Sequence, residues 1–374
     1  MTKKWSSRLT FFAFVVLMVG LGSNDSLRGI FSTIFQEHFS LTTTQLGLIV
    51  TASYIGNLVF LLVGGNLSTR FSKKRVLQVL ILIWMAALAL FAFTSNYTVL
   101  LIGMALALGS STLLNTTMNL ITPLLFATAP GFFVNFLFFT QEIGTSGSQY
   151  ILGSHADGFA FWQHTNLVLL ILGAVAFVLL LFCNVPEEAA APADAPAQKG
   201  GYDWRIIVPY VLVFGFYFIA EHGVMNWMVA YGVDGLGLPQ ASAAKYLSVF
   251  FGGMMIGRLC LSPLVDKLGA LKSLAAFGGV SCVLYLIGSL GGAVTMPVWA
   301  ISGLSFSILY PTLVMSIRLY FPAQQVSGAA GTILSIASLA DILFNVGFGK
   351  LVDMAGYAVS IRVLPLSALA FFIV

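Results

Sequence analysis

Long hydrophobic runs separated by short polar stretches extend along the whole chain. Most of them reach the roughly 20 residues that a helix needs to cross a hydrocarbon core about 30 Å thick. The alternating pattern of about ten residues that marks the strands of a membrane barrel fits them less well. The runs predict twelve membrane-spanning helices, over residues 9–35, 44–66, 76–94, 98–126, 131–153, 165–184, 206–231, 242–264, 272–291, 296–319, 328–349 and 359–374.

One segment between the sixth and seventh runs breaks this pattern. Residues 185–203 read VPEEAAAPADAPAQKGGYD, and a stretch so rich in alanine, proline and charge cannot bury enough apolar surface to fold. It predicts an amino-terminal six-helix bundle over 1–185, a cytoplasmic linker over 186–204 and a carboxyl-terminal six-helix bundle over 205–374. Since only 359–374 remain for the last helix, we expect that helix to be truncated.

The two halves share a weak internal repeat. The stretches GSHADGFAF (153–161) and GKLVDMAGY (349–357) place Asp157 against Asp353 at an offset of 196 residues. Parallel repeats of this kind are typical of two similar bundles that rock around a site near the bilayer midplane. The predicted fold class is therefore an all-α membrane protein with twelve transmembrane helices in two six-helix bundles.

Composition agrees with this prediction. Hydrophobic residues make up 59% of the 374 residues and charged residues only 8%, whereas a soluble domain carries roughly a quarter. The net charge of +4 does not indicate nucleic-acid binding, because the basic residues lie in short loops. The three cysteines show no paired spacing, so neither a metal site nor any cofactor is expected.

Basic residues gather in alternate loops, which predicts the orientation of the chain. They precede the first span and lie between spans two and three and between spans eight and nine, at Lys3, Lys4, Arg8, Arg70, Lys73, Lys74, Arg75, Lys267 and Lys272. The positive-inside rule places such loops in the cytoplasm. We therefore expect a multi-pass protein of the cell inner membrane with a cytoplasmic amino terminus.

Several ionisable side chains fall within the predicted spans. Each would cost about 2.5–3.5 kcal/mol at the bilayer centre, so such groups face protein or water and mark transport pathways. An aqueous central cavity accounts for their number. The acids that are candidates for proton coupling are Asp25, Glu142 and Glu221.

Polar and aromatic residues recur three or four positions apart in the same spans, which places them on shared helix faces. Amides and carboxylates bind hydroxyl groups, and aromatic rings stack on the C–H face of a sugar. The predicted substrate-binding residues are Asn24, Arg28, Asn115, Asn119, Gln141, His222, Asn226, Trp227, Tyr310, Asp341 and Asn345, with Phe139 as a further stacking ring.

Structural roles remain alternatives for several of these residues. Asp25 and Arg28 are three positions apart and can simply neutralise one another. Asn115 and Asn119 are equally suited to hydrogen bonding between helices. The GxxxG motif at 253–257 predicts close helix packing rather than a binding loop.

No enzyme signature occurs in the sequence. The chain lacks HExxH, the phosphate-binding GxxxxGK[ST] loop and the GxSxG elbow. We therefore expect a protein that is not an enzyme and that is driven by an ion gradient or by the gradient of its own substrate.

The loop GGNLSTRFSKKRVL (64–77) resembles the signature that the major facilitator superfamily carries between its second and third spans. The resemblance implies a gating loop that contains Arg70, Lys73 and Arg75 and, in the matching loop of the second half, Asp266. Ser68 stands where the signature has an acid.

Other stretches look like the fucose permease group of sugar:proton symporters, among them GSNDSLRGIF (22–31), LLNTTMNLITP (113–123) and FIAEHGVMNWMVAY (218–231). This similarity implies coupling through one acid in the first span, which corresponds to Asp25, and a second acid in the fourth. The second position falls on Asn115, an amide that cannot titrate. Glu142 or Glu221 in that role, coupling to sodium, and uncoupled transport all remain open.

These observations lead to one main prediction and two alternatives. We expect a monomeric secondary transporter in the lipid bilayer that moves a monosaccharide or related sugar by alternating access, with a proton or sodium as coupling ion. The first alternative is an efflux antiporter for amphipathic small molecules, with a pocket rich in phenylalanine and methionine. The second is a transporter-like sensor that binds its ligand without moving it.

Overall fold

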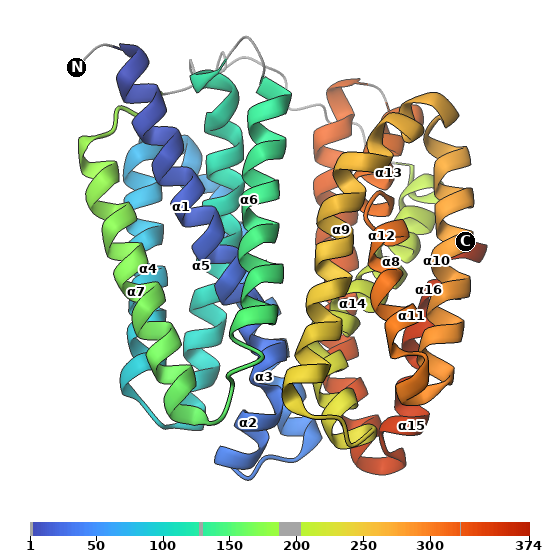
Figure 1. The fold of residues 1–374 in the computed structure, drawn as a ribbon. Helices are drawn as coiled ribbons and strands as arrows, with labels where there is room; N and C mark the ends of the chain where they lie inside the picture. The colour runs from blue at the N-terminus through green and yellow to red at the C-terminus, as the bar shows by residue number, and fades with distance from the viewer. Residues whose placement is uncertain (1–2, 127–129, 187–202, 322) are drawn as a thin grey trace. The chain divides into compact units, whose positions relative to one another are not determined.

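The computed structural model describes residues 3–126, 130–186, 203–321 and 323–374. These residues form helices joined by short turns, with no strand among them (Figure 1). The helices of the first half are α1 (Lys3–Ile30), α2 (Ser32–His38), α3 (Thr43–Arg70), α4 (Lys73–Phe93), α5 (Tyr97–Leu125), α6 (Pro130–Ile151) and α7 (Phe159–Phe182). Those of the second half are α8 (Trp204–Ala230), η1 (Tyr231–Gly235), α9 (Gln240–Leu268), α10 (Ala270–Leu290), η2 (Gly292–Val294), α11 (Met296–Ile301), α12 (Gly303–Phe306), α13 (Leu309–Ser316), η3 (Ile317–Leu319), α14 (Ala323–Ala355), α15 (Tyr357–Ser360) and α16 (Val363–Ile373).

Ten helices in the described part of the chain are long and apolar enough to cross a membrane. The protein is therefore a multi-pass membrane protein. Each of the twelve predicted spans coincides with one helix or with a run of consecutive short helices. The fifth span corresponds to α6, and the twelfth to the shorter apolar segment Tyr357–Ile373.

The tenth predicted span is broken rather than continuous. It consists of α11, α12 and α13, with breaks near Ser302 and Ser307. The Ser302 hydroxyl donates to the Trp299 carbonyl at 2.5 Å, and the Ser307 hydroxyl donates to the Leu304 carbonyl at 2.7 Å. Serine side chains that bond to the preceding turn in this way often bend a helix. The hydrophobic pattern of the sequence does not predict such a bend.

Polar residues before several helices fix where those helices begin. Asn96 accepts a hydrogen bond from the Val99 amide at 3.2 Å, and Asp203 accepts one from the Arg205 amide at 2.9 Å. Such caps satisfy amide groups that have no partner within the helix. The start of α5 and the start of α8 are therefore set by single side chains.

The chain divides into two compact units. The first comprises Met1–Asp25, Ala52–Thr145 and Gly158–Gly200, and the second comprises Ser26–Thr51, Ser146–Asp157 and Gly201–Val374. The boundaries fall inside α1, α3 and α6. The division into bundles at 1–185 and 205–374 stays a prediction, and residues 187–202 of the predicted linker lie outside the described residues.

In the first unit, α4 packs against both α5 and α7 (Figure 1). Helices α1 and α6 cross through a pair of glycines. A Cβ atom on Gly22 would lie 2.1 Å from the Gln141 carbonyl oxygen, and one on Gly144 would lie 2.1 Å from the Val19 carbonyl oxygen. Only glycine fits at either position, because any side chain would meet backbone.

In the second unit, α8 packs against α14 and α16, and α9 packs against α12. The GxxxG motif lies at the α9–α12 contact, where a Cβ on Gly257 would be 2.5 Å from the Leu304 carbonyl oxygen. One on Gly253 would be 3.0 Å from the Leu304 amide nitrogen. The prediction of close helix packing is confirmed.

Asp353, at the carboxyl-terminal end of α14, caps the start of α3 within the second unit. Its two carboxylate oxygens accept hydrogen bonds from the Thr43 amide at 2.8 Å and from the Thr44 amide at 2.7 Å. A carboxylate is favoured there because the amino-terminal end of a helix carries partial positive charge. The repeat places Asp157 at the equivalent position, but α9 begins at Gln240 without a side-chain cap.

Replacement of Asp353 by alanine is expected to destabilise the protein by about 0.5–2 kcal/mol, since it leaves two helix amides without their acceptor. Thermal unfolding of the purified protein in detergent would measure this loss. Asp157→Ala is the matched control and should change the stability by no more than about 0.5 kcal/mol. Equal effects of the two substitutions would contradict the capping role.

Candidate functional site

Three predicted substrate-binding residues form a chain of amide hydrogen bonds in the first unit. Asn115 Nδ2 donates to Gln141 Oε1, and Asn119 Nδ2 donates to Asn115 Oδ1, both at 2.6 Å. Asn115 and Asn119 lie on α5, and Gln141 lies on α6. All three are half-buried. The chain therefore links two helices and presents both donors and acceptors.

Asn24 and Asp25 on α1 point to different partners in the same unit. Asn24 Oδ1 accepts a hydrogen bond from the Trp84 indole at 3.2 Å, and the Asn24 side chain is buried. Asp25 Oδ2 accepts a hydrogen bond from the Ser111 hydroxyl at 3.1 Å. Ser111 precedes Asn115 by one turn of α5. Asp25 therefore adjoins the helix that carries the amide chain. The other proton-coupling candidate of this unit, Glu142 on α6, is half-buried.

His222 and Asp341 form an ion pair in the second unit. His222 Nδ1 on α8 lies 2.7 Å from Asp341 Oδ2 on α14. The histidine side chain is 24% exposed and the aspartate side chain only 2% exposed. Arg28 and Glu221 both lie near enough to act on the ring electrostatically. The structure therefore brings four predicted site residues together.

An aromatic cluster lies beside this group. The Phe306 ring stacks on Tyr217 and on Tyr285, with centroid separations of 4.9 and 5.3 Å. Glu221 acts electrostatically on Tyr217, Tyr285 and Tyr310. The half-buried Tyr310, predicted as a stacking ring, lies 5.8 Å from the Tyr217 ring. Tyrosines of three helices, α8, α10 and α13, therefore lie near Glu221.

Two other predicted residues bond to each other. The Trp227 indole donates to Asn345 Oδ1 at 2.8 Å, and both side chains are fully buried. Asn345 Nδ2 in turn donates to the Asp341 carbonyl at 2.7 Å. Asn226, beside Trp227, is 2% exposed. In this arrangement the Trp227–Asn345 pair holds α8 to α14, and contact of these residues with a substrate stays a prediction.

The first turn of α4 anchors the end of a neighbouring helix. Lys74 Nζ donates to the Leu181 carbonyl at 3.0 Å and to the Cys183 carbonyl at 2.7 Å. These carbonyls lie at the carboxyl-terminal end of α7, where a cation is favourable. Lys74, which was not among the predicted gating residues, therefore anchors the end of α7.

The predicted gating residues themselves are less fully defined. Lys73 is buried, with 6% of its surface exposed, whereas Arg75 is exposed. The side chains of Arg70 and Asp266 lie outside the described residues. The gating role of all four stays a prediction.

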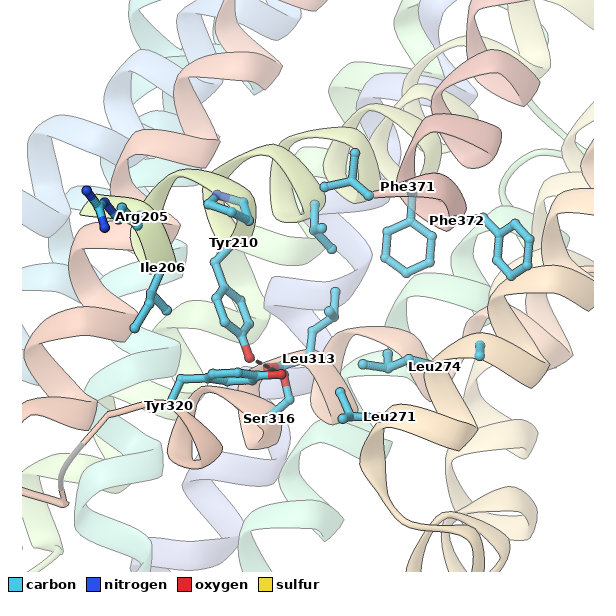
Figure 2. A pocket seen from close by; sticks show the side chains of 14 residues that line it. Arg205, Ile206, Tyr210, Leu271, Leu274, Leu313, Ser316, Tyr320, Phe371 and Phe372 are labelled. Atoms are coloured by element: carbon cyan, nitrogen blue, oxygen red, sulfur yellow. Dashed lines mark hydrogen bonds between the residues drawn. The ribbon is translucent and has the colours of Figure 1, made fainter. Parts of the chain in front are cut away.

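A cavity of about 540 Å³ lies at the amino-terminal end of α8 in the second unit (Figure 2). Most of its lining is apolar. Its polar lining includes Arg205 and a 2.8 Å hydrogen bond between the hydroxyls of Tyr210 and Ser316, with the Tyr320 ring beside them. None of the predicted substrate-binding residues lines this cavity, so it is separate from the groups described above.

The sequence profile of the Major Facilitator Superfamily matches residues 10–345. The chain belongs to this superfamily. The resemblance seen in the sequence is thus confirmed, as is the predicted fold class.

Several known transporters are similar to this chain over most of its length. The L-fucose-proton symporter of Escherichia coli (strain K12) is 24% identical over 333 residues, which cover 77% of this chain and 75% of the relative. The glucose/galactose transporter of Brucella abortus biovar 1 (strain 9-941) is 27% identical over 344 residues, covering 85% and 81%. A crystal structure of a mutant nucleoside transporter NupG superposes with a TM-score of 0.79 at 11% identity, covering 100% of this chain and 98% of that one.

Some neighbours of the candidate residues in this superfamily member were not predicted. Ser111 could have been found, because it lies four positions before Asn115 on the same face of α5. Trp84 and Phe306 carry no local signal, since their partners are distant in the sequence. The capping role of Asp353 was likewise not predicted, although the repeat had singled out the position.

Replacement of Asn115 by alanine is expected to weaken substrate binding about tenfold. The change removes the middle member of the amide chain, so Gln141 and Asn119 each lose a hydrogen bond that holds the amide in place, worth about 0.5–1.5 kcal/mol. Equilibrium binding to purified protein would measure it. Thr116→Ala, at an exposed position one residue further along α5, is the control. Unchanged affinity in Asn115→Ala would exclude the amide chain from the substrate site.

Proposed function

We propose that the protein is a secondary active transporter that moves a monosaccharide or related sugar across the inner membrane by alternating access, in symport with protons. The observation that carries the proposal is the amide chain Gln141–Asn115–Asn119 within membrane-spanning helices. Half-buried amides with both donors and acceptors suit a ligand rich in hydroxyl groups. In the interior of a membrane protein, such groups mark substrate pathways.

The relatives support the same substrate class. The similar proteins include an L-fucose-proton symporter and a glucose/galactose transporter. Their identities of 24% and 27% support a sugar as the substrate without indicating which sugar. The aromatic rings Tyr310 and Phe139 are both half-buried, as stacking on a sugar ring requires.

The coupling ion is proposed to be a proton that binds at Asp25. Asp25 is half-buried and accepts a hydrogen bond from Ser111 on α5. Protonation removes its charge, and it converts one oxygen from an acceptor into a donor. Binding and release of the proton can thereby alter the contacts between α1 and α5. Glu142 and Glu221 are the further carboxylates proposed for proton transfer.

The orientation in the membrane and the oligomeric state are also part of the proposal. The basic loops favour a cytoplasmic amino terminus. The protein is proposed to act as a monomer in the lipid bilayer.

Uptake of radiolabelled sugars into proteoliposomes tests the proposal. A panel of hexoses, pentoses, deoxysugars and hexuronates would be offered with and without an inward proton gradient. We expect one or more sugars to accumulate above the external concentration only with the gradient. A sodium gradient at equal pH on both sides of the membrane is the control that tests whether sodium can drive uptake instead of protons.

Three outcomes would overturn the proposal. Accumulation driven by a sodium gradient alone would show that sodium, and not the proton, is the coupling ion. Gradient-driven movement of amphipathic dyes without any sugar movement would indicate the efflux antiporter. Sugar binding without flux would indicate a sensor.

A further inference from the structure

His222 and Asp341 are held close together inside the helix bundle. The Nδ1–Oδ2 distance is 2.7 Å, and a carboxylate oxygen can only accept, so Nδ1 is the donor. The exposed fraction of the histidine is 24%, against 2% for the aspartate. One partner is therefore accessible, and the other is enclosed.

Stability alone does not account for such a pair. Removing two charged groups from water costs about as much free energy as their attraction returns, and apolar residues of the same size are often as stable. Within a membrane the cost of ionisable groups is higher still. A pair that lies in a spanning region and adjoins other ionisable groups is therefore a candidate for function.

Charged groups from three helices act on the His222 ring. They are Asp341 on α14, Glu221 on α8 itself and Arg28 on α1. Two of these groups are acidic and one is basic, so the ring lies among charges of both signs. The Phe218 ring stacks on the imidazole at a centroid distance of 5.3 Å and an interplanar angle of 6°. The ring is thus fixed in orientation between opposing charges.

The other helices packed on α8 supply further groups whose action on His222 is weaker or absent. Helix α16 has no ionisable residue in its sequence. Helix α2 carries Glu37 and His38, both exposed. Arg258 on α9 acts on Tyr217 and on Tyr310 of α13. The charged groups that act on His222 are therefore Asp341, Glu221 and Arg28.

We propose that the His222–Asp341 pair is a second proton-binding site of the transporter, in which His222 binds and releases a proton in addition to the one at Asp25, and Asp341 positions its ring. This inference rests on the proposed function. Asn115 stands where the resemblance implies a second acid, and its amide cannot titrate. His222 would supply a titratable group in the second half of the chain instead.

The proton balance of the cycle is simple. Nδ1–H stays bonded to Asp341 throughout, and Nε2 takes one proton from water on the outer side, which gives an imidazolium. The same nitrogen returns that proton to water on the cytoplasmic side, which restores the neutral ring. One proton enters and one leaves at His222 in each cycle, and no bond other than N–H forms or breaks.

Arg28 supplies the means of switching between these two forms. It lies in the same compact unit as His222 and Asp341, but on helix α1 rather than on α8 or α14. A shift of α1 relative to α8 changes the separation between the Arg28 guanidinium and the His222 ring. Retreat of the guanidinium favours protonation of His222, and its return favours release.

The first experiment compares His222→Gln with the wild type in proteoliposomes. Glutamine keeps a donor and an acceptor but cannot carry the proton. We expect accumulation driven by a proton gradient to fall to the equilibrium ratio of one, while sugar counterflow, which needs no net proton movement, stays detectable. His164→Gln, at an exposed position on α7, is the matched control and should accumulate sugar like the wild type.

The second experiment tests the positioning role of Asp341 and remains informative if His222→Gln does not fold. In Asp341→Asn, the midpoint of the pH dependence of counterflow should move to lower pH by one unit or more, because the imidazolium has lost its carboxylate partner. In Arg28→Gln the midpoint should move to higher pH. A change in maximal rate with an unmoved midpoint in both variants would indicate a merely structural pair.

The outcomes separate this inference from the proposed function. If wild-type protein transports no sugar, the proposed function fails. If the wild type accumulates sugar and His222→Gln accumulates it equally, only the proton-binding role of the pair fails.

Discussion

Asp25→Asn is expected to abolish accumulation of sugar against its gradient. Asparagine matches the shape of the carboxylate but cannot bind or release a proton, and Asp25 is the only acid in α1. Its hydrogen bond with Ser111 can persist, because the amide oxygen still accepts. Proton-driven uptake into proteoliposomes should therefore fall to the equilibrium ratio, which is at least a tenfold loss where the wild type accumulates tenfold.

The matched control for this prediction is Glu37→Gln, an equivalent loss of one carboxylate at an exposed position on α2. It should accumulate sugar like the wild type. Counterflow measured in parallel reports whether Asp25→Asn still folds and exchanges sugar. Undiminished uphill uptake by Asp25→Asn would remove Asp25 from the coupling mechanism.

The largest loss of stability is expected from Gly144→Val. The new Cβ would lie 2.1 Å from the Val19 carbonyl oxygen, and backbone on both sides of the crossing cannot move aside as a flexible side chain could. Overpacking of this kind costs about 1–3 kcal/mol and occasionally more. We expect a marked fall in the unfolding temperature and in the yield of monodisperse protein.

Gly147→Val on the same helix is the control. No atom lies within 4 Å of a Cβ built there, so the change should cost no more than about 0.5 kcal/mol. Thermal unfolding of both variants in the same detergent would compare them directly. Equal stability of the two variants would show that α1 and α6 are not in close contact.

The twelve spans were predictable because hydrophobic length is a strong local signal. A helix must satisfy its own backbone within the membrane, so an apolar run of about 20 residues leaves few other structures. The break of the tenth span near Ser302 was not predictable. It depends on which carbonyl a serine hydroxyl selects, and the hydrophobic pattern is the same for a straight helix.

The candidate site was predictable in part for a similar reason. Helical periodicity placed Asn115 and Asn119 on one face, and the two are bonded to one another. Periodicity does not report contacts between helices. It selected both His222 and Asp341 but not their pairing across 119 residues of sequence. The partners of Asn24 and Asp25 depend in the same way on tertiary packing.

The glycine crossing between α1 and α6 has a mechanical consequence. With main chain pressed against main chain and no side chain between, the contact has almost no compliance, and the two helices will travel as one piece. Asp25 on α1 and Gln141 on α6 therefore lie on two helices that move as one rigid body. A displacement that begins at the carboxylate therefore reaches the amide chain with little loss of amplitude.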